Sequence, residues 1–139
     1  MLSYSNFTAA PGTPEKMKKA ADIVRTKRPD LEVDGDIQAD AAVNPLIVDK
    51  IFPFCNIKGG ANILIFPNLE SSNIAYKLIQ QIGKVEVLGP FIMGIRKSAN
   101  VLQRTTTVDG IFNSVVMTTL EAQYIKTIKE KKAQLSKAP

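Results

Sequence analysis

Residues 62–66 read Asn-Ile-Leu-Ile-Phe, an almost wholly apolar run that stops at Pro67 and Asn68. A short run of this kind is typical of a strand covered on both faces, as in a parallel α/β sheet. A helical pattern follows it, with Ser71 or Ser72 as the expected N-cap and Gly83 at the C-terminal end. The stretch therefore predicts a buried strand followed by a helix whose apolar stripe consists of Ile74, Leu78, Ile79 and Ile82.

The rest of the chain continues this alternation. Strands are expected at residues 2–5, at 31–33 with a continuation at Ile37, and within 85–95. Helices are expected after Pro11-Gly12, at 44–51 and from Thr107 onward. Cap residues followed by proline predict two of these starts, with Thr13 before Pro14 and Asn44 before Pro45. The pattern favours an α/β fold with a mostly parallel sheet and flanking helices.

Composition narrows the possible functions. The 139 residues carry a net charge of +5, but the basic residues are not interleaved with aromatics, and there is no Trp, so nucleic acid is not an expected partner. The absence of His removes the commonest general base and metal ligand. The single cysteine, Cys55, lies among Phe52, Phe54 and Ile57 and is expected to be a core thiol. No apolar run is long enough to cross a bilayer, so no membrane partner is expected and a cytoplasmic location is the default expectation.

The spacing of polar residues along the chain does not by itself identify a metal site or a catalytic site. Asp34, Asp36 and Asp40 surround Gly35, but the ligand order of a calcium loop is missing, so a turn with hydrogen-bonded carboxylates is favoured and no metal site is expected. Residues 71–73 could hold a phosphate on free N–H groups at a helix start, or simply cap that helix.

Three ordered motifs carry a resemblance that covers residues 1–125. The segment 63–77 is similar to F-P-[DN]-L-x-x-x-N-I-[AG]-Y-K, residues 28–42 to R-P-D-L-x-V-D-G-x-x-Q-x-D-A-A, and residues 88–104 to a closing region that ends in L-S-R. These motifs resemble the phosphate acetyl/butyryltransferase family. The resemblance implies an isocitrate/isopropylmalate dehydrogenase-like fold with two lobes and an acyl-CoA site between them. Residues 1–88 then form most of the second lobe, and residues 89–139 form the return segment and terminal helix of the first.

A narrower resemblance points to the C-terminal domain of bacterial NADP-dependent malic enzymes. Residues 2–7, 58–62 and 120–123 carry it. It implies a non-catalytic domain that senses acetyl-CoA and dimerises, beside an upstream malic-enzyme module that uses NADP and a divalent metal. A fragment of an active phosphate acetyltransferase and a purely structural oligomerisation module stay open as alternatives.

Departures from the family pattern favour lost catalysis. The closing motif places Gln103 at the family's serine position, and Gly110 replaces an acidic residue proposed as the base toward the CoA thiol. The loop after the first strand loses the lysine and glycine of the family's S-T-K-G-S pattern. By the resemblance no catalytic residue remains, acetyl-CoA is the expected ligand, and no other cofactor is expected in this stretch. The residues expected to contact acetyl-CoA are Ser5, Asn6, Asn73, Tyr76, Lys77, Gln103 and Arg104.

The terminal helix carries an apolar stripe that would lose its usual packing surface if most of the first lobe were absent. Exposing such a stripe is unfavourable by about 25 cal/mol per Å². A homodimer, or exchange of helices between copies, is therefore expected.

Overall fold

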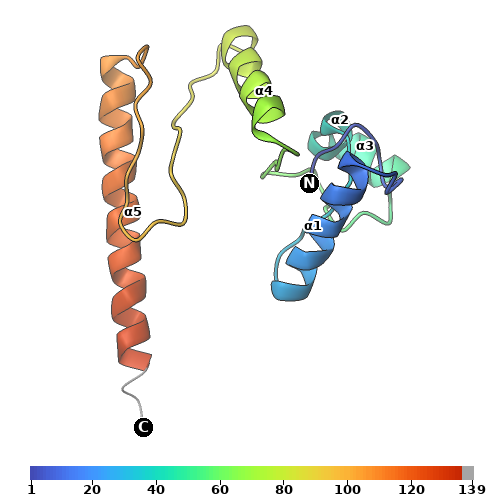
Figure 1. The fold of residues 1–139 in the computed structure, drawn as a ribbon, viewed down its shortest axis with the longest axis horizontal. Helices are drawn as coiled ribbons and strands as arrows, with labels where there is room; N and C mark the ends of the chain where they lie inside the picture. Colours follow the sequence, from blue (N-terminus) through green and yellow to red (C-terminus); the bar gives the residue numbers. More distant parts are fainter. Residues whose placement is uncertain (136–139) are drawn as a thin grey trace. The chain divides into compact units, whose positions relative to one another are not determined.

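Helices make up most of the regular structure in the computed structural model, which describes residues 1–135 (Figure 1). The chain falls into two units, one from Met1 to Gly83 and the other from Lys84 onward. The first unit holds four helices and the second holds one. Their bounds are Thr13–Lys27 for α1, Ala39–Val43 for α2, Pro45–Ile51 for α3, Leu69–Ile82 for α4 and Val108–Leu135 for α5.

Local sequence explains where two of the predicted helices begin. The Asn44 side chain accepts a hydrogen bond from the Leu46 N–H at 3.0 Å, so α3 starts at its predicted cap. The Thr107 hydroxyl accepts from the Gly110 N–H at 3.2 Å, which confirms the predicted cap of α5.

Two predicted caps were wrong. Gly12, not Thr13, is the N-cap of α1, which places Pro14 one position later than expected. The N-cap of α4 is Asn68, because its extended backbone lets its side chain accept from the Ser71 N–H at 2.8 Å. Helix α2 was not predicted at all.

The predicted sheet is reduced to isolated contacts. Within residues 1–135 the structure contains no strand, only a parallel bridge between Leu2 and Ile37 and an antiparallel bridge between Phe91 and Asn100. The Leu2 N–H also donates to the Ile65 carbonyl at 2.8 Å, so Leu2 has a backbone partner on each side. Leu2 therefore lies between two of the segments predicted as strands, but each of these contacts extends over very few residues.

The chain turns away soon after these contacts. Phe7 and Ala9 adopt positive φ angles of 56° and 50°, which extended strands do not use. The Phe7 N–H donates to the Asp36 carbonyl at 2.8 Å and closes the turn. The first segment therefore folds around Asp36 instead of continuing along Ile37.

The core of the first unit lies where these segments meet α2 and α3, the only helix pair in contact among the described residues. Its fully buried members are Leu2, Ile37, Ala41, Ala42, Val48 and Cys55. Cys55 is thus a core thiol, as its apolar neighbours predict. Pro14, Met17 and Ala21 are the buried residues of α1.

The apolar stripe of α4 is not buried. Ile74 is 60% exposed and Ile82 is 78% exposed, and α4 has no buried residue. The predicted stripe stays uncovered because no other helix of residues 1–135 packs against α4.

In the second unit, the segment before α5 runs back along that helix (Figure 1). The Asn113 side chain donates to Glu86 at 2.9 Å, and the Asn100 side chain donates to the Thr118 hydroxyl at 2.6 Å. Much of the apolar surface of α5 stays uncovered, including Val108 and Phe112.

None of the helices in residues 1–135 combines the length and the apolar composition that a membrane-spanning segment needs. The assignment of residues 1–88 and 89–139 to two lobes of a larger domain stays a prediction.

Candidate functional site

A hydrogen-bonded cluster consists of Ser5, Asn6 and Thr8 with Asp36 and Gln38, and we call it the polar loop. The Ser5 hydroxyl donates a short hydrogen bond to the Asp36 carboxylate and lies 3.0 Å from the Thr8 hydroxyl. The Ala9 N–H donates to the other carboxylate oxygen at 3.3 Å. Asp36 is fully buried, so these donors take the place of water at its carboxylate oxygens.

Asn6 and Gln38 hold the other side of the polar loop in a reciprocal pair. The Gln38 N–H donates to the Asn6 side-chain oxygen at 2.8 Å, and the Asn6 amide donates back to the Gln38 side-chain oxygen at 2.7 Å. The Gln38 amide donates further to the Tyr4 carbonyl at 2.7 Å. Two predicted ligand residues, Ser5 and Asn6, are thus brought together, but their polar atoms already have partners within the chain.

Phe7 anchors the polar loop to the core. Its ring lies 5.3 Å from that of Phe52 and 5.0 Å from that of Phe54, the latter edge-on. Such edge-to-face contacts are favourable beyond the area they bury. The loop position is therefore set by aromatic packing on one side and by Asp36 on the other.

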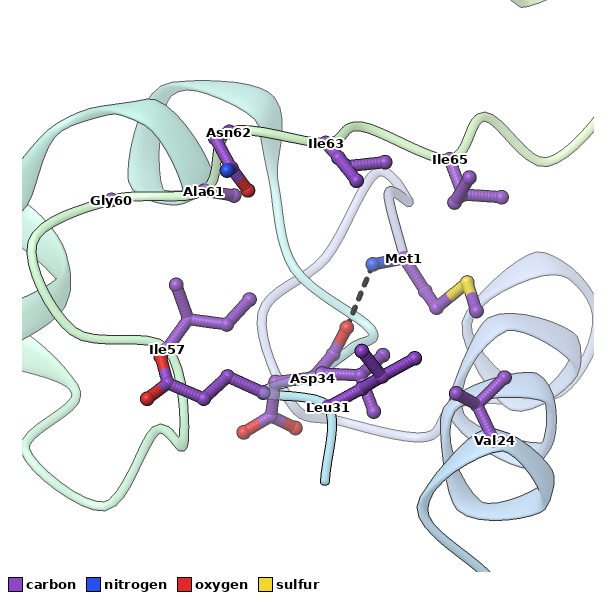
Figure 2. Close-up of a pocket in the computed structure, with 12 residues that line it drawn as sticks. Met1, Val24, Leu31, Asp34, Ile57, Gly60, Ala61, Asn62, Ile63 and Ile65 are labelled. Atoms are coloured by element: carbon purple, nitrogen blue, oxygen red, sulfur yellow. Dashed lines mark hydrogen bonds between the residues drawn. The ribbon is translucent and has the colours of Figure 1, made fainter. Parts of the chain in front are cut away.

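A second feature of this unit is an apolar cavity of about 480 Å³ beside Asp34 (Figure 2). The terminal ammonium of Met1 donates to the Asp34 carbonyl at 2.7 Å. The Asp34 carboxylate faces other donors, namely the Gly35 N–H and both the N–H and the side-chain amide of Asn56, at 2.8–3.0 Å. The apolar side chains that line the cavity include those of Val24, Leu31, Val33, Ile57, Ile63 and Ile65.

The neighbouring thiol is poorly suited to act as a nucleophile. Burial raises the pKa of Cys55, and the nearby negative charge of Asp34 adds to that rise. A thiol with a raised pKa is mostly protonated at neutral pH, and the thiolate is the reactive form.

The other predicted site residues lie elsewhere. Asn73, Tyr76 and Lys77 are on α4, where the Lys77 ammonium lies 5.0 Å from the centre of the Tyr76 ring. Gln103 and Arg104 belong to the second unit, just before α5.

The turn that holds Gln103 and Arg104 is closed by Thr106. The Thr106 N–H and hydroxyl both donate to the Gln103 carbonyl, at 3.0 and 2.7 Å. Gly110 follows in the first turn of α5, where a Cβ atom would come within 2.9 Å of the Thr106 methyl group. The acidic side chain that the family pattern places at position 110 would therefore require Thr106 to move.

Sequence reasoning favoured a turn with hydrogen-bonded carboxylates at Asp36, whose carboxylate does accept hydrogen bonds, but it named none of Thr8, Asp36 and Gln38 as a site residue. Gln38 follows the predicted second strand at its carboxyl end, and Asp36 lies just before the continuation of that strand at Ile37. In a parallel sheet such residues meet those that follow the neighbouring strand at the same edge, and this signal could have placed them beside Ser5.

Comparison with known proteins places this arrangement in a family. Residues 1–119 match the family described as phosphate acetyl/butaryl transferase. The chain is 40% identical to the phosphate acetyltransferase of Clostridium acetobutylicum over 124 residues, which covers 88% of this chain and 37% of that protein. It is 39% identical to the phosphate acetyltransferase of Acetivibrio thermocellus over 127 residues, covering 91% of this chain and 38% of that protein.

A solved structure agrees. The EutD phosphotransacetylase from Staphylococcus aureus is similar with a TM-score of 0.78 at 31% sequence identity, over 88% of this chain and 38% of that one. The chain thus spans less than two-fifths of the length of these relatives. The similarity also supports the predicted fold in part, since that neighbour is a phosphotransacetylase, although the described residues here are mostly helical.

These relatives overturn the narrower prediction from the sequence. A non-catalytic, acetyl-CoA-sensing domain of a malic enzyme was expected, yet curated relatives at 36–40% identity are named phosphate acetyltransferase. The oxidoreductase assignment is wrong for the same reason, and the acetyltransferase alternative is the better supported one. By the match over residues 1–119 and by these relatives, the chain belongs to the phosphate acetyl/butaryl transferase family.

Proposed function

We propose that this chain is part of a phosphate acetyltransferase, which exchanges an acetyl group between CoA and inorganic phosphate. The observation that carries the proposal is the 40% identity to a phosphate acetyltransferase over 88% of the chain. In this reaction a phosphate oxygen attacks the thioester carbonyl, the carbon–sulfur bond breaks, and CoA leaves as a thiolate. Acetyl-CoA and phosphate are then the ligands, and the reaction takes place in the cytoplasm.

Arg104 is the proposed contact to the anionic ligand. Its position matches the arginine of the family's closing motif, and a guanidinium can stabilise the negative charge that develops on phosphate or sulfur. The turn that carries it is held by the two hydrogen bonds from Thr106 to the Gln103 carbonyl. Asn73, Tyr76 and Lys77, all on α4, stay proposed ligand contacts on the strength of the family pattern.

Ser5 and Asn6 are proposed to position the polar loop rather than to bind the ligand through their side chains. The Ser5 proton is committed to Asp36, and the Asn6 amide is committed to Gln38. A donor that already has a good acceptor gains little from a second one.

Gln103 and Gly110 are proposed to slow the transfer. The serine and the acidic side chain that the family pattern places at these positions would assist the leaving thiolate and the proton transfer. Losing a general acid or base typically lowers the rate by about 10²–10⁴-fold. The expected enzyme is therefore slow, and Gln103→Ser should raise its turnover.

The test uses the complete polypeptide that carries these residues and follows phosphate-dependent release of the CoA thiol from acetyl-CoA. Arg104→Ala should lower kcat/KM by about 10²-fold or more. Arg28→Ala is the matched control, because Arg28 pairs only with Asp30 at the surface. The absence of phosphate-dependent thiol release would refute the proposed function. Equal rates for Arg104→Ala and Arg28→Ala would refute the role of Arg104.

A further inference from the structure

The second unit contains a pocket of about 470 Å³ that none of the sequence motifs accounts for. One wall is the loop at residues 96–98, and the other is the face of α5 from Ala122 to Glu130. We call it the basic pocket, because four of the side chains that line it are cationic: Arg96, Lys97, Lys126 and Lys129.

The charges of the basic pocket are unbalanced. Among the lining residues that the structure describes, Glu130 is the one acidic side chain, and the four cations outnumber it by three positive charges. Among the described residues, no ion pair engages any of the four cations. By contrast, the basic residues Lys18, Lys19 and Arg25 on α1 all have carboxylate partners. Four unpaired cations that converge on a hollow raise the local concentration of anions.

The two walls are held together by neutral and acidic side chains next to the cations. The Ser98 hydroxyl donates a short hydrogen bond to the Glu121 carboxylate, and the Asn100 amide donates to the Thr118 hydroxyl at 2.6 Å. Thr118, Glu121, Ile125 and Lys129 follow one another at helical spacing along α5. The contacts that fix the loop therefore place Arg96 and Lys97 opposite the lysines of α5.

The floor of the pocket is apolar. Ala122 and Ile125 supply the apolar part of its lining. A pocket of several hundred Å³ with a small apolar surface and convergent charges has the form of a site for a small organic anion. A ligand with a single charge would leave most of the cations unpaired, whereas two linked phosphates would engage both walls.

The basic pocket also extends beyond the family match. That match ends at residue 119, whereas Lys126, Lys129 and Glu130 lie further along α5. The pocket therefore combines a loop inside the matched segment with helix residues outside it.

We propose that the basic pocket binds a small molecule that carries two linked phosphate groups. The four cations contact the phosphates, and Ala122 and Ile125 contact the organic part. The proposal uses none of the residues proposed to take part in the acetyl transfer reaction. Two common sources share this chemistry: a nucleoside diphosphate and the diphosphate of CoA.

Calorimetric titration of the chain with pyrophosphate tests the proposal. Wild-type protein should bind pyrophosphate more tightly than orthophosphate, and the affinity should fall as salt rises. The double variant Lys126→Gln/Lys129→Gln keeps good helix formers but removes two charges, and should weaken binding by about tenfold or more. Lys18→Gln/Lys19→Gln removes the same charge from α1 and should leave binding unchanged.

The same titration with ADP and with CoA distinguishes the two sources of a diphosphate. ADP binding that the Lys126→Gln/Lys129→Gln variant weakens would identify a nucleotide-type ligand, and CoA binding with the same sensitivity would identify CoA as the source. CoA binding lost in Arg104→Ala but retained in the lysine variant belongs to the acetyl transfer site and would count against CoA here. If pyrophosphate fails to bind, or binds both double variants equally, the proposal is refuted.

Discussion

The carboxylate of Asp34 is expected to hold the segment that contains Cys55, and Asp34→Ala tests this directly. Asp34 is only 5% exposed and accepts three hydrogen bonds, from the Gly35 N–H and from two groups of Asn56. Arg25 lies 3.8 Å away, but its guanidinium already contacts Asp22 at 2.7 Å. The Asp34→Ala substitution therefore mainly removes the hydrogen bonds between Asn56 and the carboxylate of Asp34.

The size of the effect follows from these donors. A hydrogen bond to a charged group contributes about 1.5–3 kcal/mol, and a buried donor left unpaired is destabilising by about 1–3 kcal/mol. The three contributions are not additive, and the adjacent cavity lets water reach some of the freed donors. A loss of about 2–4 kcal/mol is expected, which corresponds to about a 30- to 700-fold change in the opening equilibrium of the segment.

Labelling of the thiol measures this opening, because Cys55 is the only cysteine of the chain and is fully buried. The labelling rate of Asp34→Ala relative to wild type should rise by about the factor given above, after each rate is normalised to that of the urea-unfolded protein. The normalisation removes the effect of Asp34 on thiol reactivity. Asp30→Ala removes an exposed carboxylate paired with Arg28 and should label like wild type. Equal labelling of the two variants would refute the role of Asp34.

Three other outcomes are expected. Burial raises the pKa of Cys55 above its ordinary value of about 9, so the stabilising effect of the neutral thiol is complete below about pH 9 and lost as pH rises through the raised value. Urea unfolding from pH 7 upward should show this alkaline loss, and Cys55→Ala should reduce it. Gly110→Ala should stabilise α5 by up to about 1 kcal/mol only when Thr106→Ser removes the methyl group 2.9 Å from the new Cβ. A double-mutant cycle by thermal unfolding measures the coupling, and additive effects would contradict it. The uncovered surface of α5 predicts a homodimer, so light scattering should give twice the 15.2 kDa chain mass, and Phe112→Lys should shift the protein toward monomer. A monodisperse wild-type monomer would rule this out.

The helices were largely predictable because their signals are local. Asn44 before Pro45 fixes the start of α3, and Thr107 fixes the start of α5 through a hydrogen bond to a residue three positions away. Asn68 was taken only as the end of a strand, although a side chain that stops one element can cap the next. In each of these caps the side chain and the N–H group that it binds are only two or three residues apart in the sequence, so the local sequence is enough to predict them.

The sheet and most of the polar loop depend on contacts that sequence patterns do not fix. Leu2 pairs with Ile37 and donates to Ile65, residues far from it in the sequence, and the pairing ends where Phe7 turns toward Asp36. Ser5 and Asn6 were named from the family pattern. Their partners Asp36 and Gln38 emerge only once the two segments are placed side by side.

The Phe7 ring contacts the rings of Phe52 and Phe54, so the backbone course of the polar loop does not depend on which polar side chains the loop presents. Asp36 and the aromatic rings fix the course of the backbone, while the lysine and glycine of the family pattern are absent here. Evolution can therefore exchange the residues that this loop presents without losing the turn that presents them. In protein engineering terms, position 7 should tolerate little variation, whereas the exposed Thr8 is a site where new side chains can be introduced on an existing scaffold.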